Sequence, residues 1–130
     1  PGVVVGRKGS IGTVWWCDRD FWPIDTAFFV EPVGGTGLRF AYALLRWMQL
    51  GEHNGDSAVP GLNRDVALAQ PVPRVIAELA EDFEALATPI MNLSQVLREE
   101  TARLAATRDA LLPELMSGRL TIRTLEGSVR

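Results

Sequence analysis

Between Arg74 and Ser117 the chain carries a long heptad pattern of apolar residues. Large apolar side chains recur there at alternating spacings of three and four, which is typical of a helix that pairs with other helices. The sequence therefore predicts one long amphipathic helix whose apolar face is unbroken over seven positions from Ile76 to Leu97 and then includes the polar residues Glu100 and Thr107. We call this face the apolar seam, and its positions are Ile76, Leu79, Phe83, Leu86, Ile90, Leu93, Leu97, Leu104, Leu111 and Leu115.

The length of this segment indicates what the seam packs against. A helix of about 44 residues, at 1.5 Å of rise per residue, is roughly 65 Å long. That is about twice the width of a globule built from the 73 residues before it. Each large apolar side chain left in water would forgo about 1.5 to 3 kcal/mol of burial free energy. We therefore expect most of the seam to meet another chain or another segment.

Proline and glycine mark two points along the predicted helix. Pro89 lacks a backbone N–H and disfavours helical geometry at Thr88, so we expect a bend or a short break there. The seam keeps its register across Pro89, which favours a kinked helix over two independent ones. Gly118 stands where a helix C-cap is expected, followed by a short strand or extended tail at residues 120–122.

A change of composition at Pro73 defines the expected domains. Residues before it are rich in glycine, tryptophan, phenylalanine and proline, whereas those after it are mostly alanine, leucine, glutamate and arginine. The fold class is therefore α+β, with a small mixed domain at 1–73, the long helix at 74–118 and a tail at 119–130. The chain opens without Met, directly in an apolar run, which suggests a fragment or processed piece whose preceding part holds half a sheet.

Residues 1–73 are expected to form strands and one helix. Short runs rich in β-branched and aromatic residues predict strands, and near-helical apolar spacing predicts the helix. The run at 26–30 is apolar on both faces, so we expect it to be buried. The expected elements are strands at 3–5, 13–17, 26–30 and 66–72, a helix at 38–50 that stops at Gly51, and a helical turn at 64–66 capped by Asn63.

The loop from Gly6 to Gly12 joins the first two expected strands. Its three glycines in seven residues cost conformational entropy, which predicts a special backbone geometry or a close approach. It lacks the Gly-Lys-Ser/Thr ending of a phosphate-binding loop and opens no helix. By itself it is a hairpin loop with two cations at the tip, and a structural role and a binding role both stay open.

Catalytic and metal-binding patterns are not recognisable in the sequence. His53 is the only histidine and Cys17 the only cysteine, and neither has the spacing of a metal site or a catalytic triad. The acids at 78, 81, 82 and 84 suit the start of a helix. We predict no catalytic residues, no metal and no cofactor, and we rank a small enzyme as the least favoured class. A lone cysteine excludes an internal disulfide and fits a reducing compartment.

Charge and hydropathy narrow the remaining classes. The net charge is −3, so the chain as a whole is not basic, and no segment indicates nucleic acid by charge alone. No apolar run approaches the roughly 18 residues of a membrane span, and no signal peptide is recognisable. We expect a soluble, cytoplasmic protein that does not enter a membrane.

Five segments, taken in order, are similar to one protein family. They are Gly6–Gly12 (GRKGSIG), Trp22–Phe28 (WPIDTAF), Ser57–Asn63 (SAVPGLN), Pro71–Pro73 (PVP) and Arg108–Gly118 (RDALLPELMSG). Together they make the chain resemble the DNA sequence-specificity subunits of type I restriction-modification systems.

The resemblance implies a non-catalytic reader of double-stranded DNA. Such a subunit carries two recognition domains separated by two long helices that pack antiparallel as a ruler, and it binds methyltransferase subunits and restriction subunits. By this resemblance residues 1–73 are the later part of one target recognition domain. The long helix then forms an antiparallel coiled coil, and a half-subunit expressed alone would self-associate through Ile76 to Leu115.

The resemblance also implies which residues contact DNA. Arg7, Lys8 and Ser10, on the glycine loop, are the first candidates for phosphate or base contacts. Asn63 and Arg64 are second candidates, with helix capping as an open alternative. The competing hypothesis is a coiled-coil assembly or regulatory protein that binds no nucleic acid. Loss of salt-dependent DNA binding on changing Arg7 and Lys8 to alanine would separate the two.

Overall fold

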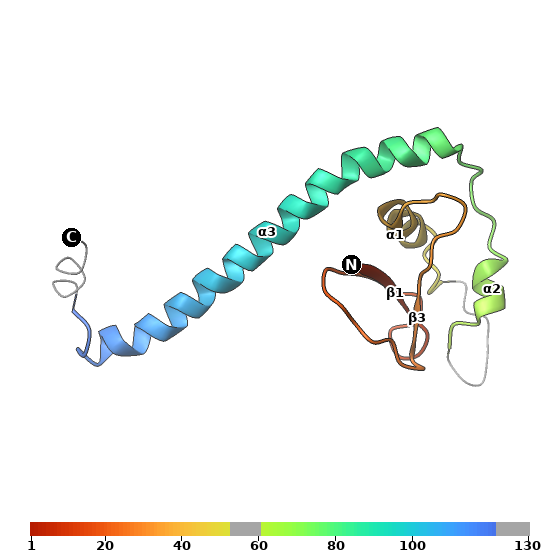
Figure 1. Ribbon diagram of the computed structural model, residues 1–130. Coiled ribbons are helices and arrows are strands. Elements are labelled where there is room, and N and C mark those ends of the chain that lie inside the picture. Colours follow the sequence, from red (N-terminus) through yellow and green to blue (C-terminus); the bar gives the residue numbers. More distant parts are fainter. Residues whose placement is uncertain (53–60, 122–130) are drawn as a thin grey trace. The chain divides into compact units, whose positions relative to one another are not determined.

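The structure is a computed structural model that describes residues 1–52 and 61–121 (Figure 1). These residues contain a small antiparallel sheet and a long helix, which confirms the α+β class. The first compact unit is Pro1–Ile90, and it includes the first turns of the long helix. The elements are β1 (Gly2–Gly6), β2 (Val14–Cys17), β3 (Ala27–Phe29), α1 (Leu38–Trp47), α2 (Arg64–Leu68) and α3 (Ala77–Met116).

The sheet has β1 at its centre. Its order is β2-β1-β3, and β1 pairs antiparallel with both neighbours. The valines suit a central strand, and Val3 is 0% exposed. The two predicted strands joined by a glycine loop are confirmed as β1 and β2. The third strand is also present, but its expected burial is wrong at Phe29, which is 53% exposed because β3 is an edge strand with an uncovered face.

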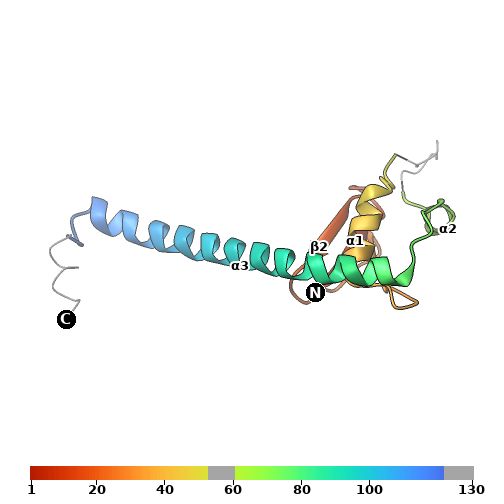
Figure 2. The same ribbon diagram turned by 90° about the horizontal axis from the view of Figure 1, so that it is seen from above.

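A small apolar core lies between the sheet and the segments that follow it. α1 lies against β2 and β1 (Figure 2), and the Trp16 ring meets the Tyr42 ring edge-on at 5.8 Å. The core cluster consists of Val5, Leu50 and Leu62, with Ile11, Val14, Phe28, Val30, Leu45, Met48 and Ala67 partly buried against it.

The structure corrects the predicted end of α1. This helix ends at Trp47, before the expected Leu50. Gln49 has a φ of 49°, so the chain leaves the helix there. Leu50 then enters the core, where it is 2% exposed. Burial of one leucine outweighs continuation of the helix to Gly51.

The predicted strand at 66–72 is wrong. Residues 64–68 form α2, and residues 69–73 belong to no strand. The Asn63 side chain accepts hydrogen bonds from the Asp65 and Val66 N–H groups at 2.8 and 3.4 Å, which confirms the predicted cap. This cap favours a helix where the apolar run alone suggested a strand. Pro71 and Pro73 then provide no N–H for a sheet.

The long predicted helix is confirmed as α3, with a later start and no break. It begins at Ala77 rather than Arg74, and it is helical throughout Ala77–Met116, including Pro89. A proline removes one hydrogen bond of the helical ladder, and the Thr88 hydroxyl donates to the Glu84 carbonyl at 2.6 Å on the preceding turn. The alternative of a short break at Pro89 is therefore wrong.

Gly118 ends α3 as predicted for a C-cap. Its φ is 71°, and its N–H donates to the Leu115 carbonyl at 3.2 Å. The Leu120 N–H donates to the Glu114 carbonyl at 3.0 Å, which closes the turn. Leu120 and Thr121 are not in a strand, and Ile122 lies outside the described residues.

Candidate nucleic-acid interface and helix seam

Backbone hydrogen bonds hold the loop from Gly6 to Gly12 in one shape. The Gly12 N–H donates to the Gly6 carbonyl at 2.9 Å, which closes the loop on itself. The Arg7 and Lys8 N–H groups both donate to the Thr26 carbonyl, at 2.9 and 3.1 Å. The loop is therefore attached to the residue that precedes β3, and the side chains at 7 and 8 start from a fixed backbone.

The glycines confirm the predicted close approach. Gly12 has a φ of 71°, and a Cβ added to it would overlap the backbone nitrogen of Gly51. A Cβ at Gly6 would overlap the Ser10 carbonyl oxygen. Gly9 has a φ of 74° but open space around it. Gly12 thus allows the loop to pack on the segment after α1, whereas Gly9 only supplies the turn at the tip.

This difference gives a stability prediction for two alanine substitutions. Gly9→Ala places a side chain at positive φ in open space, so it should cost about 1 kcal/mol of unfolding free energy. Gly12→Ala has the same backbone cost and also forces the Gly51 backbone to move, so it should cost about 3 kcal/mol or more. Urea unfolding of both variants measures the difference. Equal losses would show that the loop does not pack on Gly51.

Arg7 and Lys8 are exposed, and Asp25 holds them both. The Arg7 Nη1 donates to the Asp25 carbonyl at 3.2 Å, and its guanidinium lies 5.6 Å from the centroid of the Phe28 ring. The Lys8 Nζ lies 3.4 Å from the Asp25 carboxylate, and these two side chains are 48% and 75% exposed. Ser10 is also exposed. The loop tip is therefore cationic, with one carboxylate that partly offsets its charge.

The structure brings the second group of candidates next to the first. The Leu62 N–H donates to the Arg7 carbonyl at 2.8 Å, so the segment that contains Asn63 and Arg64 adjoins the loop. Asn63 is a helix cap, because its oxygen accepts from Asp65 and Val66. Arg64 is exposed at the start of α2. All five predicted DNA-binding residues thus belong to one region of the domain, although Asn63 also has a structural role.

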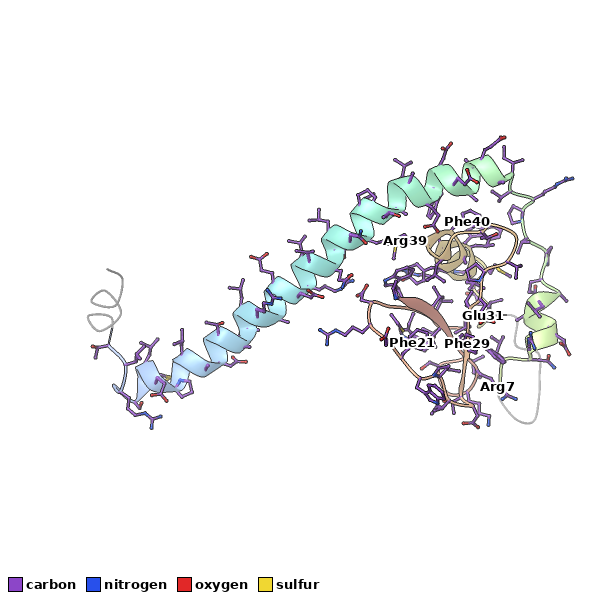
Figure 3. The ribbon with its side chains drawn as sticks, viewed as in Figure 1. Arg7, Phe21, Phe29, Glu31, Arg39 and Phe40 are labelled. Atoms are coloured by element: carbon purple, nitrogen blue, oxygen red, sulfur yellow. The ribbon has the colours of Figure 1, made fainter. Side chains whose placement is uncertain are left out.

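Sequence reasoning missed two features of this region. One is Asp25, which lies within the segment WPIDTAF and contacts Arg7 through its backbone carbonyl and Lys8 through its carboxylate; its opposite charge could have indicated only the contact with Lys8. The other is a cavity of about 620 Å³ beside β3, near Phe29 and Glu31 (Figure 3). It is lined by Val5, Ala27, Phe28, Phe29, Val30, Glu31, Val33, Leu45, Leu50, Leu62, Arg64, Ala67 and Leu68.

The predicted apolar seam is exposed along its whole length. Its ten residues range from 37% exposure at Phe83 to 71% at Leu86. Phe83 is the least exposed because its ring meets the Phe40 ring edge-on at 5.7 Å. A different face of α3 carries the buried position, Ala80, which is 8% exposed. The packing within residues 1–90 therefore leaves the seam positions up to Ile90 largely uncovered.

Some residues singled out in the sequence lie outside the described residues, and others form no metal-binding group within them. His53 and most of the segment 57–63 are outside them. Within residues 1–52 and 61–121, no group of three or more histidine, cysteine, aspartate or glutamate side chains could hold a metal ion. Cys17 is half-buried in β2.

Comparisons with family models, with curated proteins and with solved structures found no match to the chain. In the part of the chain that the structure describes, no helix has the length and apolar character to cross a membrane. The function is therefore argued from the loop, the segment beside it and the seam.

Proposed function

We propose that this chain is the DNA recognition subunit, or a half-subunit, of a cytoplasmic type I restriction-modification enzyme. In this role it reads duplex DNA and places methyltransferase and restriction subunits on it, without catalysing a reaction itself. The observation that carries the proposal is the hydrogen bond between the Leu62 N–H and the Arg7 carbonyl. It joins two segments that are far apart in sequence and that both resemble the family, and it brings the backbone next to Asn63 and Arg64 beside the loop that carries Arg7 and Lys8.

The chemistry of the loop tip fits contact with DNA. Arg7 has five guanidinium donors, and its described hydrogen bond to Asp25 uses one nitrogen. An arginine fork can bind a guanine edge or a phosphate, and a lysine is a point charge suited to phosphate. Ser10 can add a hydroxyl contact to the backbone. Because Phe28 supports the Arg7 guanidinium, less side-chain entropy is lost on binding.

The exposed seam supplies the second half of the proposed function. The apolar seam side chains would be covered if a second long helix packed antiparallel against them, with Glu100 and Thr107 as polar positions within the interface. In a full subunit that helix belongs to the same chain, and in a half-subunit it belongs to a second copy. Pairing would fix the separation of two recognition domains on DNA.

A salt titration with an Asp25 variant tests the DNA part of the proposal. Asp25→Asn removes the carboxylate that offsets Lys8, so duplex DNA should bind about three- to tenfold more tightly at low salt. Folding should change by less than about 1 kcal/mol, because the ion pair is exposed. Fluorescence anisotropy with labelled duplex DNA, at several salt concentrations from about 50 to about 300 mM, would measure both the affinity and its salt dependence.

Asp109→Asn is the matched control. Asp109 pairs with Arg108 at 2.7 Å and is about as exposed, at 64%, but it lies in α3 away from the loop in sequence. Its removal changes the net charge equally and should leave DNA binding nearly unchanged. If the two variants bind DNA equally, the loop tip is not the contact surface, and the gain is a general charge effect.

A coiled-coil assembly protein that binds no nucleic acid is the second candidate. It is favoured by the contacts of Asp25 with both Arg7 and Lys8, which a purely structural loop would also need. The seam serves this alternative equally well. Self-association without salt-dependent DNA binding would favour it over a DNA reader.

A further inference from the structure

A single carboxylate on α3 caps the start of α1. The Glu84 Oε1 accepts a hydrogen bond from the Phe40 N–H at 2.7 Å. Gly37, the N-cap residue of α1, offers no side-chain cap, and the first turn of α1 contains no acid. The first N–H groups of a helix lack partners within it and favour negative charge nearby. Glu84 supplies from α3 what the sequence around α1 lacks.

The same carboxylate connects α3 to the sheet. The Glu84 Oε2 lies 3.6 Å from the Arg39 guanidinium, and both side chains are about four-fifths buried, at 21% and 20% exposure. The Arg39 guanidinium lies 5.4 Å from the centroid of the Trp16 ring on β2. Arg39 and Phe40 face the first turns of α3 in Figure 3. A continuous set of contacts therefore runs from β2 through α1 to α3.

Small residues let the carboxylate come this close. A Cβ added to Gly37 would overlap the Glu84 carboxyl group, so a larger residue there would displace it. On α3, Ala80 is 8% exposed one turn before Glu84. The contact between α3 and α1 thus combines a close fit with one charged hydrogen bond, and Phe83 against Phe40 is its main apolar part.

This contact determines which way the seam faces. At about 100° per residue, Ala80, Glu84 and Ala87 lie on one face of α3, whereas Leu79, Leu86 and Ile90 lie roughly a third of a turn away. With Glu84 seated on α1, those seam side chains are 57%, 71% and 67% exposed. A rotation of the helix that buried them against the domain would remove Glu84 from the Phe40 N–H.

We infer that Glu84 is a positioning residue: it fixes the rotational setting of the first turns of α3, up to Ile90, on the domain, so that the seam there points outward to a second helix. The inference rests on the helix pairing in the proposed function, and it adds the residue that sets how the recognition domain and the paired helices are joined. Without Glu84, part of the seam can turn toward the domain, so a smaller fraction of the molecules exposes the seam to a second helix.

Amide hydrogen exchange of three variants of the full chain tests the contact itself. In Glu84→Ala the Phe40 amide should exchange about tenfold faster or more, because a charged hydrogen bond is lost. In Glu84→Gln the side-chain oxygen can still accept from Phe40, so the increase should be smaller, about threefold. Glu81→Ala, which removes an exposed acid one turn earlier, is the control and should leave Phe40 unchanged. The β1 amides should exchange alike in all three variants.

Self-association of the same variants tests the consequence. Glu84→Ala should raise the dissociation constant of the pair about tenfold, as measured by sedimentation. Glu81→Ala should leave it unchanged, because only Glu84 holds the helix in the rotation in which the seam is exposed. Equal Phe40 exchange in the two alanine variants, or exchange that rises equally in β1, would overturn the inference. So would unchanged pairing in Glu84→Ala. If the unmodified chain is a monomer, the helix pairing of the proposed function fails, whereas the Phe40 exchange still reports on Glu84 separately.

Discussion

Changing Leu97 to aspartate should turn a self-associated chain into a monomer. Leu97 lies on the seam and is 52% exposed, so the substitution removes little from the fold of one chain. In a symmetric pair it removes two leucines from the interface, about 3 to 6 kcal/mol of burial free energy. The dissociation constant should therefore rise by about 100-fold or more. Analytical ultracentrifugation over a range of concentrations measures this change.

Ala102→Asp is the matched control for this substitution. It adds the same charge to the same helix, and Ala102 is exposed about 140° around the helix from Leu97. Circular dichroism should show equal helix content in both variants when each is monomeric. If Ala102→Asp disrupts association as strongly as Leu97→Asp, the interface does not follow the seam. If the unmodified chain sediments as a monomer at high concentration, the pairing proposal is wrong.

The sequence predicted α3 and its seam well because both depend on local periodicity. The spacing of Leu86, Ile90 and Leu93 is visible without any knowledge of the fold, and no described segment covers these side chains. The loop glycines were predicted for a similar reason. A glycine-rich stretch between two apolar runs is typical of a turn or of a close contact between backbones. Gly12 makes the expected close contact, with the backbone of Gly51.

Features that depend on distant partners were not predictable in the same way. Glu84 belongs to a group of acids that suited the start of a helix, and nothing in the sequence indicates that it caps α1, 44 positions earlier. Asp25 lies within the family-like segment Trp22–Phe28, just before the strand expected at 26–30, and no local pattern indicates its contact with the loop cations. The strand expected at 66–72 failed because the apolar pattern was given more weight than the cap at Asn63. In each case a side-chain contact decided what periodicity could not.

The glycine loop and the seam place different demands on the domain between them. The loop needs a rigid backbone, which the bonds of Arg7 and Lys8 to Thr26 supply. The seam needs a fixed direction, which we propose that Glu84 supplies through its hydrogen bond with the Phe40 N–H at the start of α1. If the proposed function holds, a domain with both features would relate the position of the paired helices to the position of the DNA contact. The backbone bonds to Thr26 hold the part of the loop from which the Arg7 and Lys8 side chains start.

Changing Arg7 and Lys8 together to alanine should abolish most of the DNA affinity. If both contact phosphates, the slope of log affinity against log salt should fall by about 1.8, because each phosphate contact contributes about 0.9. At moderate salt the affinity should drop about tenfold or more. Folding should change little, because the Lys8–Asp25 pair is exposed and Arg7 donates only one described hydrogen bond. Anisotropy titrations at several salt concentrations measure the slope directly.

Arg103→Ala combined with Arg108→Ala is the control, because it removes the same charge from exposed positions on α3. If DNA contacts the loop, the slope of log affinity against log salt should be unchanged in this variant. Equal loss in both double variants would mean that binding follows net charge, and no salt-dependent binding in the unmodified chain would favour the assembly protein. The comparison separates the two functions because the seam is intact in the Arg7 and Lys8 variant, so pairing should persist when DNA binding is lost.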